Sequence, residues 1–238
     1  MVDVKVCWIS AGVSSFIAGY LCKDEIDKFI YIDIDDQDED TMRFIKDCEK
    51  ALGKDIEILK SEYGCVENAI LSAGVIKLQG GFAPCTNYLK KRVRKKWEYE
   101  HQNENITYFW GMDVNEVNRA ERLKESMPQF EHRFPLIENH MTKESSHGLL
   151  QELGIKRPRM YDLGYPNNNC VGCIKGGMGY WNKIRKDFPD VFESRCKLER
   201  RIGHSILKEC YLDELDENRG TTKEVFPECD IFCMIQRR

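Results

Sequence analysis

The first half of the chain alternates short apolar runs with amphipathic segments. Residues 4–9 and 29–34 are apolar and rich in β-branched side chains, which is typical of buried strands. Residues 14–22 and 39–52 carry apolar positions at helical spacing, and Gly53 stands where a glycine ends a helix. The pattern also predicts strands at 56–59 and 106–110 and helices near 65–72, 85–100 and 114–126.

This alternation predicts an α/β fold with a twisted, mostly parallel sheet and helices on both faces. In such sheets, ligands bind at the carboxyl ends of the strands, near the point where the strand order reverses. Polar clusters directly follow three predicted strands, at residues 10–15, 33–38 and 111–122. We therefore expect a binding site at that edge of the sheet.

The second half has a different pattern. Residues 157–180 are rich in Pro, Gly, Asn and Tyr, and two helices are predicted near 178–188 and 190–212, with Pro189 between them. We expect residues 1–155 to form a nucleotide-binding α/β domain. Residues 156–238 are expected to form a Cys-rich loop and a helical C-terminal region packed on that domain.

Composition and charge restrict the possible partners. The chain is 42% hydrophobic and 32% charged, which is normal for a globular protein with a core. No apolar run approaches the roughly 20 residues that span a bilayer, and no signal-peptide pattern precedes the first strand, so we expect a cytoplasmic protein without a membrane partner. The net charge of −4 argues against general affinity for nucleic acids.

One local exception to the acidic balance is the basic run Lys-Lys-Arg-Val-Arg-Lys-Lys-Trp at residues 90–97. Such a run forms either a solvated helix face or a surface that meets phosphates. An acceptor substrate could therefore be a small molecule or a nucleic acid bound through this run. The oligomeric state is not encoded in an obvious way, and a homodimer stays open.

The turn between the first predicted strand and helix has the composition of an anion site. It reads Ser-Ala-Gly-Val at residues 10–13, followed by Ser14 and Ser15, which are typical helix N-cap residues. A turn of small residues before a helix leaves backbone N–H groups unbonded at the positive helix end, where a phosphate or sulfate binds. An ordinary tight turn has the same composition, so both interpretations stay open.

The acidic stretch after the second strand offers metal ligands. Asp33 and Asp36 belong to Asp-x-Asp-Asp-x-Asp at residues 33–38, and carboxylates can hold Mg²⁺ together with nucleotide phosphates. The alternative is a solvated loop that ends with Asp38 as the N-cap of the next helix.

The 11 cysteines include two closely spaced pairs. Cys170 and Cys173 form a C-x-x-C motif on a loop rich in Gly and Asn, and Cys229 and Cys233 follow near the C-terminus. Four thiolates would make a tetrahedral site for zinc, and iron–sulfur ligation is equally open. The alternatives are a redox dithiol at C-x-x-C and unligated thiols.

Cys85 stands at the start of a predicted helix. That position lowers the pKa of a thiol and favours a reactive or metal-bound thiolate. A helix-capping role for Cys85 and Thr86 is the alternative.

The order of these motifs resembles that of the phosphoadenosine-phosphosulfate (PAPS) reductase family, within the PP-loop or adenine-nucleotide α-hydrolase (HUP) group. Ser-x-Gly-x-Ser-Ser at 10–15 is similar to the family's Ser-x-Gly-x-Asp-Ser loop. The likeness covers about residues 4–190. Further similar segments are Tyr-Ile-Asp at 31–33, Asp-Thr-x-Arg-Phe at 40–44, Cys-Thr-x-x-Leu-Lys at 85–90, Gly-Met-Asp-x-x-Glu-x-x-Arg at 111–119, and Tyr-Pro-Asn at 165–167 leading into the C-x-x-C motif.

This resemblance implies an enzyme that binds ATP or a related adenine nucleotide. The enzyme would cleave the α–β phosphate linkage and adenylate an acceptor, in one version for sulfur transfer. In that version Cys85, Cys170 and Cys173 would bind an iron–sulfur cluster with one open iron. The implied nucleotide-binding and catalytic residues are Ser10, Gly12, Ser14, Ser15, Arg119, Asp33 and Asp36 with Mg²⁺, and the catalytic cysteines Cys85 and Cys229.

The chain departs from the family pattern at several positions. Ser14 stands where the family has an acidic residue, Asp113 where it has Arg, and Cys85 alone where cluster-binding reductases have a Cys-Cys pair. The family's Glu-Cys-Gly tail is Glu-Cys-Asp at 228–230, so Cys229 is a nucleophile or a metal ligand. Two alternatives therefore stand beside the adenylating enzyme: a sulfonucleotide (PAPS) reductase and a module that only binds a nucleotide.

Overall fold

The computed structural model describes residues 2–78 and 82–226 of the chain. Its five strands form one sheet in the order β3-β2-β1-β4-β5, and every neighbouring pair is parallel. The predicted α/β class is confirmed, and the architecture is consistent with a Rossmann- or HUP-like fold. The strands are β1 Val2–Ile9, β2 Lys28–Asp33, β3 Ile56–Lys60, β4 Glu104–Phe109 and β5 Glu131–Arg133.

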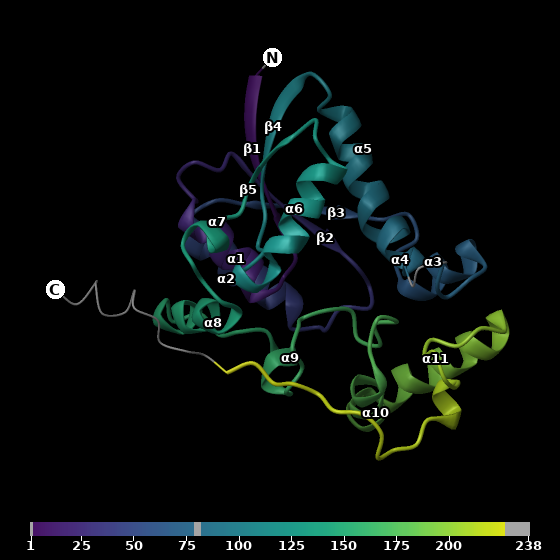
Figure 1. Cartoon of the computed structure of the whole chain (residues 1–238). Helices are drawn as coiled ribbons and strands as arrows, with labels where there is room; N and C mark the ends of the chain where they lie inside the picture. The colour runs from purple at the N-terminus through teal and green to yellow at the C-terminus, as the bar shows by residue number, and fades with distance from the viewer. Residues whose placement is uncertain (1, 79–81, 227–238) are drawn as a thin grey trace.

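Helices cover both faces of the sheet (Figure 1). Side chains along β1 alternate between the two faces: Cys7 and Ile9 pack in the cluster that contains α1 and α2, while Val4 and Val6 pack against Trp97 of α5. The helices of the first face are α1 Val13–Leu21, α2 Thr41–Leu52, α7 Pro135–Glu138 and α8 Lys143–Glu152, and those of the second are α5 Arg92–Glu100 and α6 Val117–Ser126.

Several predicted boundaries differ from those of the structure. The helix expected at 85–100 is divided into α4 Pro84–Thr86, a π-helical turn Asn87–Lys91, and α5. The short strand β5 was not predicted, because its three residues carry no clear apolar alternation. The predicted long last helix, α11 Pro189–Ile202, ends at Gly203, whose left-handed backbone stops it ten residues early.

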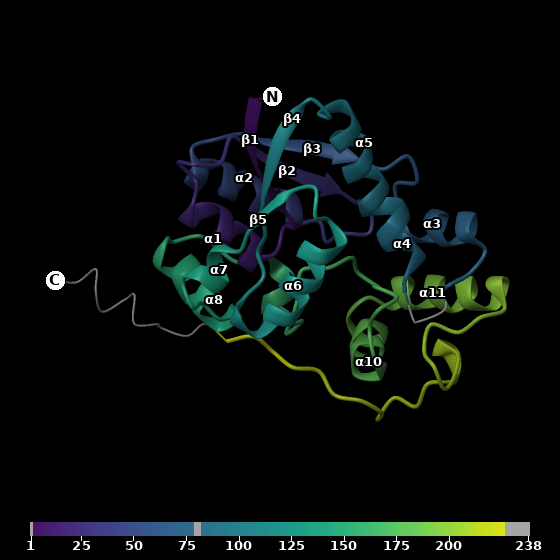
Figure 2. The same ribbon diagram turned by 45° about the horizontal axis from the view of Figure 1, so that its top comes forward.

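The C-terminal region packs against the α/β part through a shared apolar core. In Figure 2, α10 Met178–Asp187 and α11 lie beside α3 Val66–Ala73 and α4. Ile34 and Ile70 belong to the same buried cluster as Trp181 and Leu198. The boundary expected after residue 155 falls between α8 and the short helix α9, Arg159–Asp162.

Two short 3₁₀ helices, Val114–Glu116 and Leu212–Glu214, complete the elements. No helix in the described part of the chain is both long and apolar enough to cross a membrane.

Gly111 lets the segment after β4 touch the start of α1. A Cβ built on Gly111 would lie 2.4 Å from Cα of Ser15, so a side chain at this position has no room. The chain runs outward from β1 to β3 and returns at β4 on the other side of β1. The contact therefore closes the point where the strand order reverses.

Gly111→Ala should lower the free energy of unfolding by about 2 kcal/mol, because the added methyl group forces two backbone segments apart. Denaturant unfolding followed by circular dichroism measures the change. Gly177→Ala is the matched control, because a Cβ at Gly177 meets no atom within 4 Å; its cost should stay below about 1 kcal/mol. Equal losses in the two variants would contradict the close-packing argument.

Candidate functional site

A cavity of about 710 Å³ lies at the carboxyl ends of β1, β2 and β4. Its wall combines the β1–α1 turn, the end of β2, the π-helical turn, the segment after β4 and the C-x-x-C loop. The volume is within the roughly 300–1,000 Å³ of small-molecule sites. The site therefore lies at the edge of the sheet that the strand pattern predicted.

The β1–α1 turn is held by Ser15 and exposes the start of α1 to the cavity. The Ser15 hydroxyl accepts a hydrogen bond from the Ser10 N–H at 2.9 Å and donates one to the Gly12 carbonyl at 2.9 Å. Gly12 is the N-cap of α1, so the predicted capping by Ser14 and Ser15 is wrong, and both serines lie inside the helix. Gly12 has no side chain with which to cap α1, and the Tyr161 hydroxyl lies beside the Val13 N–H, so the N–H groups that follow in the first turn suit an anion.

A buried asparagine supports the same turn from the C-terminal region. Ala11 has a left-handed backbone with φ of +57°, which is unfavourable for a residue other than Gly. The Asn168 amide donates to the Ala11 carbonyl at 2.8 Å, and Asn168 is only 5% exposed. Sequence reasoning missed this residue, although it lies in the Asn run that precedes the C-x-x-C motif.

The cavity wall concentrates positive charge in a chain whose net charge is −4. Six basic residues but only two acidic ones line it, and the wall therefore favours an anionic ligand. The basic run indicated three of the six, and Arg119 came from the resemblance; sequence reasoning missed the other two, Lys143 and Lys175. The basic residues are Lys90, Lys91, Arg94, Arg119, Lys143 and Lys175, and the acidic ones are Asp113 and Glu116.

Arg119 lies at the exposed side of this wall. Its side chain is 63% exposed and is paired with Glu116. Lys143 is more enclosed: burial lowers the pKa of its ammonium group, whose Nζ donates to Oδ1 of Asn167 at 2.7 Å. Burial also raises the pKa of Asp113, whose carboxylate faces the charge of Lys143.

The two acids expected to hold Mg²⁺ do not line the cavity. Asp33 forms an ion pair with Lys60 at 2.8 Å. Asp36 is paired with the buried Arg195 of α11 and accepts a hydrogen bond from the Val66 N–H at 2.6 Å. Each carboxylate therefore already has a cationic partner outside the cavity. The alternative of Asp38 as a helix N-cap is also corrected, since Asp40 is the N-cap of α2.

Three cysteines that are distant in sequence meet at the cavity. Cys85 comes from α4, and Cys170 and Cys173 come from the C-x-x-C loop. Within residues 2–78 and 82–226, no group of three or more His, Cys, Asp or Glu side chains has the geometry to hold a metal ion. Cys229 and Cys233 lie outside the described residues, so the tetrahedral four-cysteine site stays a prediction.

Burial keeps the thiols of Cys85 and Cys170 in the protonated form when no metal is bound. Burial raises the pKa of Cys170 to about 12 and also raises that of Cys85, while the nearby Lys90 acts in the opposite direction on both. The expectation that a helix start lowers the pKa of Cys85 is therefore wrong. Desolvation by burial outweighs the lowering effect of Lys175 and Lys90 on this thiol.

In comparisons with known proteins, no family model matches the chain, and no curated protein matches it either.

Asp36→Asn should lower the free energy of unfolding by about 3 kcal/mol, because Arg195 would then keep a buried charge without its partner. Chemical denaturation of the variant measures this loss. Asp35→Asn is the control: Asp35 is exposed, makes no ion pair within the described residues, and should change stability by less than about 0.5 kcal/mol. If the Asp36→Asn protein were as stable as the wild type and its binding of ATP no longer depended on Mg²⁺, Asp36 would instead be a metal ligand.

Proposed function

We propose that this protein is a PP-loop enzyme that binds ATP or a related adenine nucleotide in the cavity and adenylates an acceptor. One observation carries this proposal: the uncapped start of α1 and six basic residues face a single cavity at the switch point of a parallel sheet. The family resemblance of the β1–α1 turn supports the choice of an adenine nucleotide.

The two sides of the cavity differ in polarity in the way a nucleotide requires. Backbone N–H groups of the β1–α1 turn and the ammonium group of Lys143 suit the phosphates. The β2 side offers an apolar surface on which a purine can lie. That surface consists of Ile32, Ile34, Val66, Leu89 and Ile174.

In the proposed reaction, a nucleophilic oxygen of the acceptor attacks the α-phosphorus. A bond forms between that oxygen and phosphorus, the α–β P–O bond breaks, and pyrophosphate leaves with the electron pair; where the oxygen belongs to a hydroxyl group, its proton passes to water. The cationic wall stabilises the charge on the leaving pyrophosphate. Asp113 stands at the position where the family has Arg, and the ammonium group of Lys143 lies near its carboxylate. We propose that Lys143 supplies the positive charge that the Arg supplies in the family.

Mg²⁺ would enter on the nucleotide. The carboxylates of Asp113 and Glu116 are the acids that line the cavity, and they do not form a ready-made metal site. Mg²⁺ commonly keeps several waters and binds through substrate phosphates and one or two carboxylates. We therefore propose that phosphate oxygens and water molecules supply most of the ligands of Mg²⁺ in the cavity.

Lys143→Met should weaken the binding of Mg–ATP by about 10- to 100-fold, because a charge-assisted contact to phosphate contributes about 1.5–3 kcal/mol. Isothermal titration calorimetry gives the affinity. Lys186→Met removes an exposed lysine outside the cavity and should bind Mg–ATP as the wild type does. Equal affinities of the three proteins would contradict this placement of the phosphates.

Turnover distinguishes the alternatives. Pyrophosphate released from Mg–ATP in the presence of acceptor supports the adenylating enzyme. Tight nucleotide binding without pyrophosphate release would favour the binding module. Sulfite release from PAPS with thioredoxin would favour the sulfonucleotide reductase.

A sulfur-transfer version of this enzyme is favoured by the three cysteines on the same cavity. A single Zn²⁺ would need its thiolates within about 4 Å of one another, given Zn–S bonds of about 2.3 Å, and the described side chains offer no such group. A larger iron–sulfur cluster bound by Cys85, Cys170 and Cys173 suits thiols that share one cavity but are further apart. With three protein ligands, such a cluster would have one iron free to bind sulfur.

The protein holds this loop in a defined conformation. The Tyr180 hydroxyl accepts a hydrogen bond from the Cys173 N–H at 2.9 Å and donates one to the Cys170 carbonyl at 3.2 Å. Gly172 between them has a φ of +71°, which glycine adopts without strain. Lys175 and Lys90 lie near enough to Cys85 to oppose the rise in the pKa of its thiol that burial causes, and they would offset the negative charge of a thiolate-bound cluster.

Protein purified without oxygen should absorb near 400 nm and carry on the order of four iron atoms per chain. Cys170→Ala should lose most of both signals, because it removes a ligand. Cys196→Ala, which removes a thiol of α11 away from the cavity, should keep them. A wild type without iron, or a Cys170→Ala protein with unchanged iron content, would overturn the cluster.

A further inference from the structure

We propose that the acceptor is a single-stranded nucleic acid, which binds along a basic strip and places one nucleotide in the cavity. This inference rests on the proposed function, since it names the acceptor of the same site. The basic strip consists of Lys90, Lys91, Arg92, Lys95 and Lys96.

The charges of the basic strip are exposed and not neutralised. All five side chains are exposed, and none forms an ion pair with a carboxylate of the described residues. Arg94 of the same run differs, because it is mostly buried and paired with Glu98. The positive charge of these five neighbouring side chains is therefore available to a polyanion.

The basic strip is continuous with the proposed nucleotide site. Lys90 and Lys91 lie in the π-helical turn and line the cavity. Lys95 is one turn beyond Lys91 on α5, which runs from α4 toward the far end of β4 (Figures 1 and 2). The positive surface therefore leads from the outside of the molecule into the cavity, as an electrostatic path for a polyanion would.

Aromatic rings beside these charges favour unpaired bases. Tyr99, one helical turn beyond Lys95, and Phe82, which precedes α4, are each 71% exposed. Between them, the Arg92 guanidinium lies 4.0 Å from the ring centroid of Tyr88 and donates to the Tyr63 hydroxyl at 3.0 Å. Bases of single strands stack on aromatic rings and on guanidinium planes, whereas the bases of a duplex are already stacked.

The concave shape also decides between anionic partners. A lipid surface could meet the outer lysines but could not enter a cavity at the strand ends. A single strand can do both, because its backbone follows the cations while one nucleotide turns inward. Its hydroxyl and carbonyl oxygens are nucleophiles that the proposed reaction can use.

The first test measures binding by fluorescence anisotropy of a labelled 20-nucleotide single-stranded RNA of mixed sequence, with the same DNA sequence, its duplex, and anionic lipid vesicles as competitors. If all five cations meet phosphates, the logarithm of the affinity should fall against the logarithm of salt concentration with a slope of about −3.5. The double variant Lys95→Gln/Lys96→Gln should bind on the order of tenfold more weakly, with a slope reduced by about 1.4.

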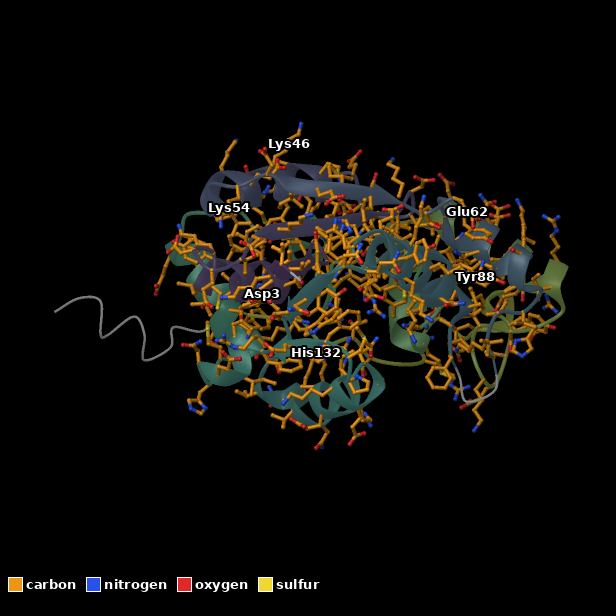
Figure 3. The ribbon with its side chains drawn as sticks, turned by 90° about the horizontal axis from the view of Figure 1, so that it is seen from above. Asp3, Lys46, Lys54, Glu62, Tyr88 and His132 are labelled. Atoms are coloured by element: carbon orange, nitrogen blue, oxygen red, sulfur yellow. The ribbon has the colours of Figure 1, made fainter. Side chains whose placement is uncertain are left out.

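A control with the same change of charge is Lys46→Gln/Lys186→Gln. Both lysines are exposed and lack an ion pair within the described part of the chain, and Lys46 on α2 lies well away from Tyr88 and the π-helical turn (Figure 3). This variant should bind the RNA as the wild type does. A weakening equal to that of Lys95→Gln/Lys96→Gln would show general charge effects and overturn the strip.

The second test separates this inference from the function on which it rests. Lys95 and Lys96 do not line the cavity, so their double variant should keep the affinity for Mg–ATP. The single strand should increase pyrophosphate release by the wild type but not by the variant. If the wild type binds ATP but not RNA, or binds RNA without faster release of pyrophosphate, the single strand is not the acceptor, and the proposed function is unaffected. Stronger competition by duplex or vesicles also overturns the single strand as acceptor, whereas a failure to bind ATP refutes the proposed function itself.

Discussion

The buried ion pair of Asp36 and Arg195 holds the C-terminal region against the edge of the sheet where the cavity forms. Their side chains are 12% and 4% exposed, so water cannot take the place of either partner. Asp36 also binds the first residue of α3 through its carboxylate and receives the Val171 N–H at its carbonyl, 2.7 Å away. Asp36 alone thereby contacts α3, α11 and the C-x-x-C loop. These contacts bring the thiols of the loop to the cavity.

The cavity combines groups that would repel one another or lose hydration without a ligand. Its wall is cationic, and burial shifts the pKa of Lys143 down and that of Asp113 up, toward the neutral form in each case. A polyphosphate would reverse the shift of Lys143 by supplying the missing negative charge. The same reasoning applies to the thiols of Cys85 and Cys170, whose pKa values are raised by burial and would be lowered by a metal or a cation that offsets the thiolate charge. The site is therefore built to be completed by what it binds.

The strand pattern determined more of the fold than of the site. Apolar runs predicted β1 to β4 and their helices, because parallel strands buried on both faces leave a strong sequence signal. β5 and the π-helical turn left no such signal, since three strand residues and one extra residue per turn barely change the periodicity. For the site, the sequence revealed the β1–α1 turn and the C-x-x-C cysteines, because the residues of each motif lie within six positions of one another.

By itself, the sequence determined the parallel α/β fold, the edge of the sheet at which the cavity lies, and the candidate turn at residues 10–15. Only the tertiary structure decided which distant residues meet there. It brought Lys143, Lys175 and Asn168 to the site and Cys85 to the C-x-x-C loop, and it removed Asp33 and Asp36 from it by pairing them with Lys60 and Arg195. Local structure follows from neighbours along the chain, whereas charge pairing and burial depend on contacts between segments that are distant in sequence, such as the 159 residues between Asp36 and Arg195.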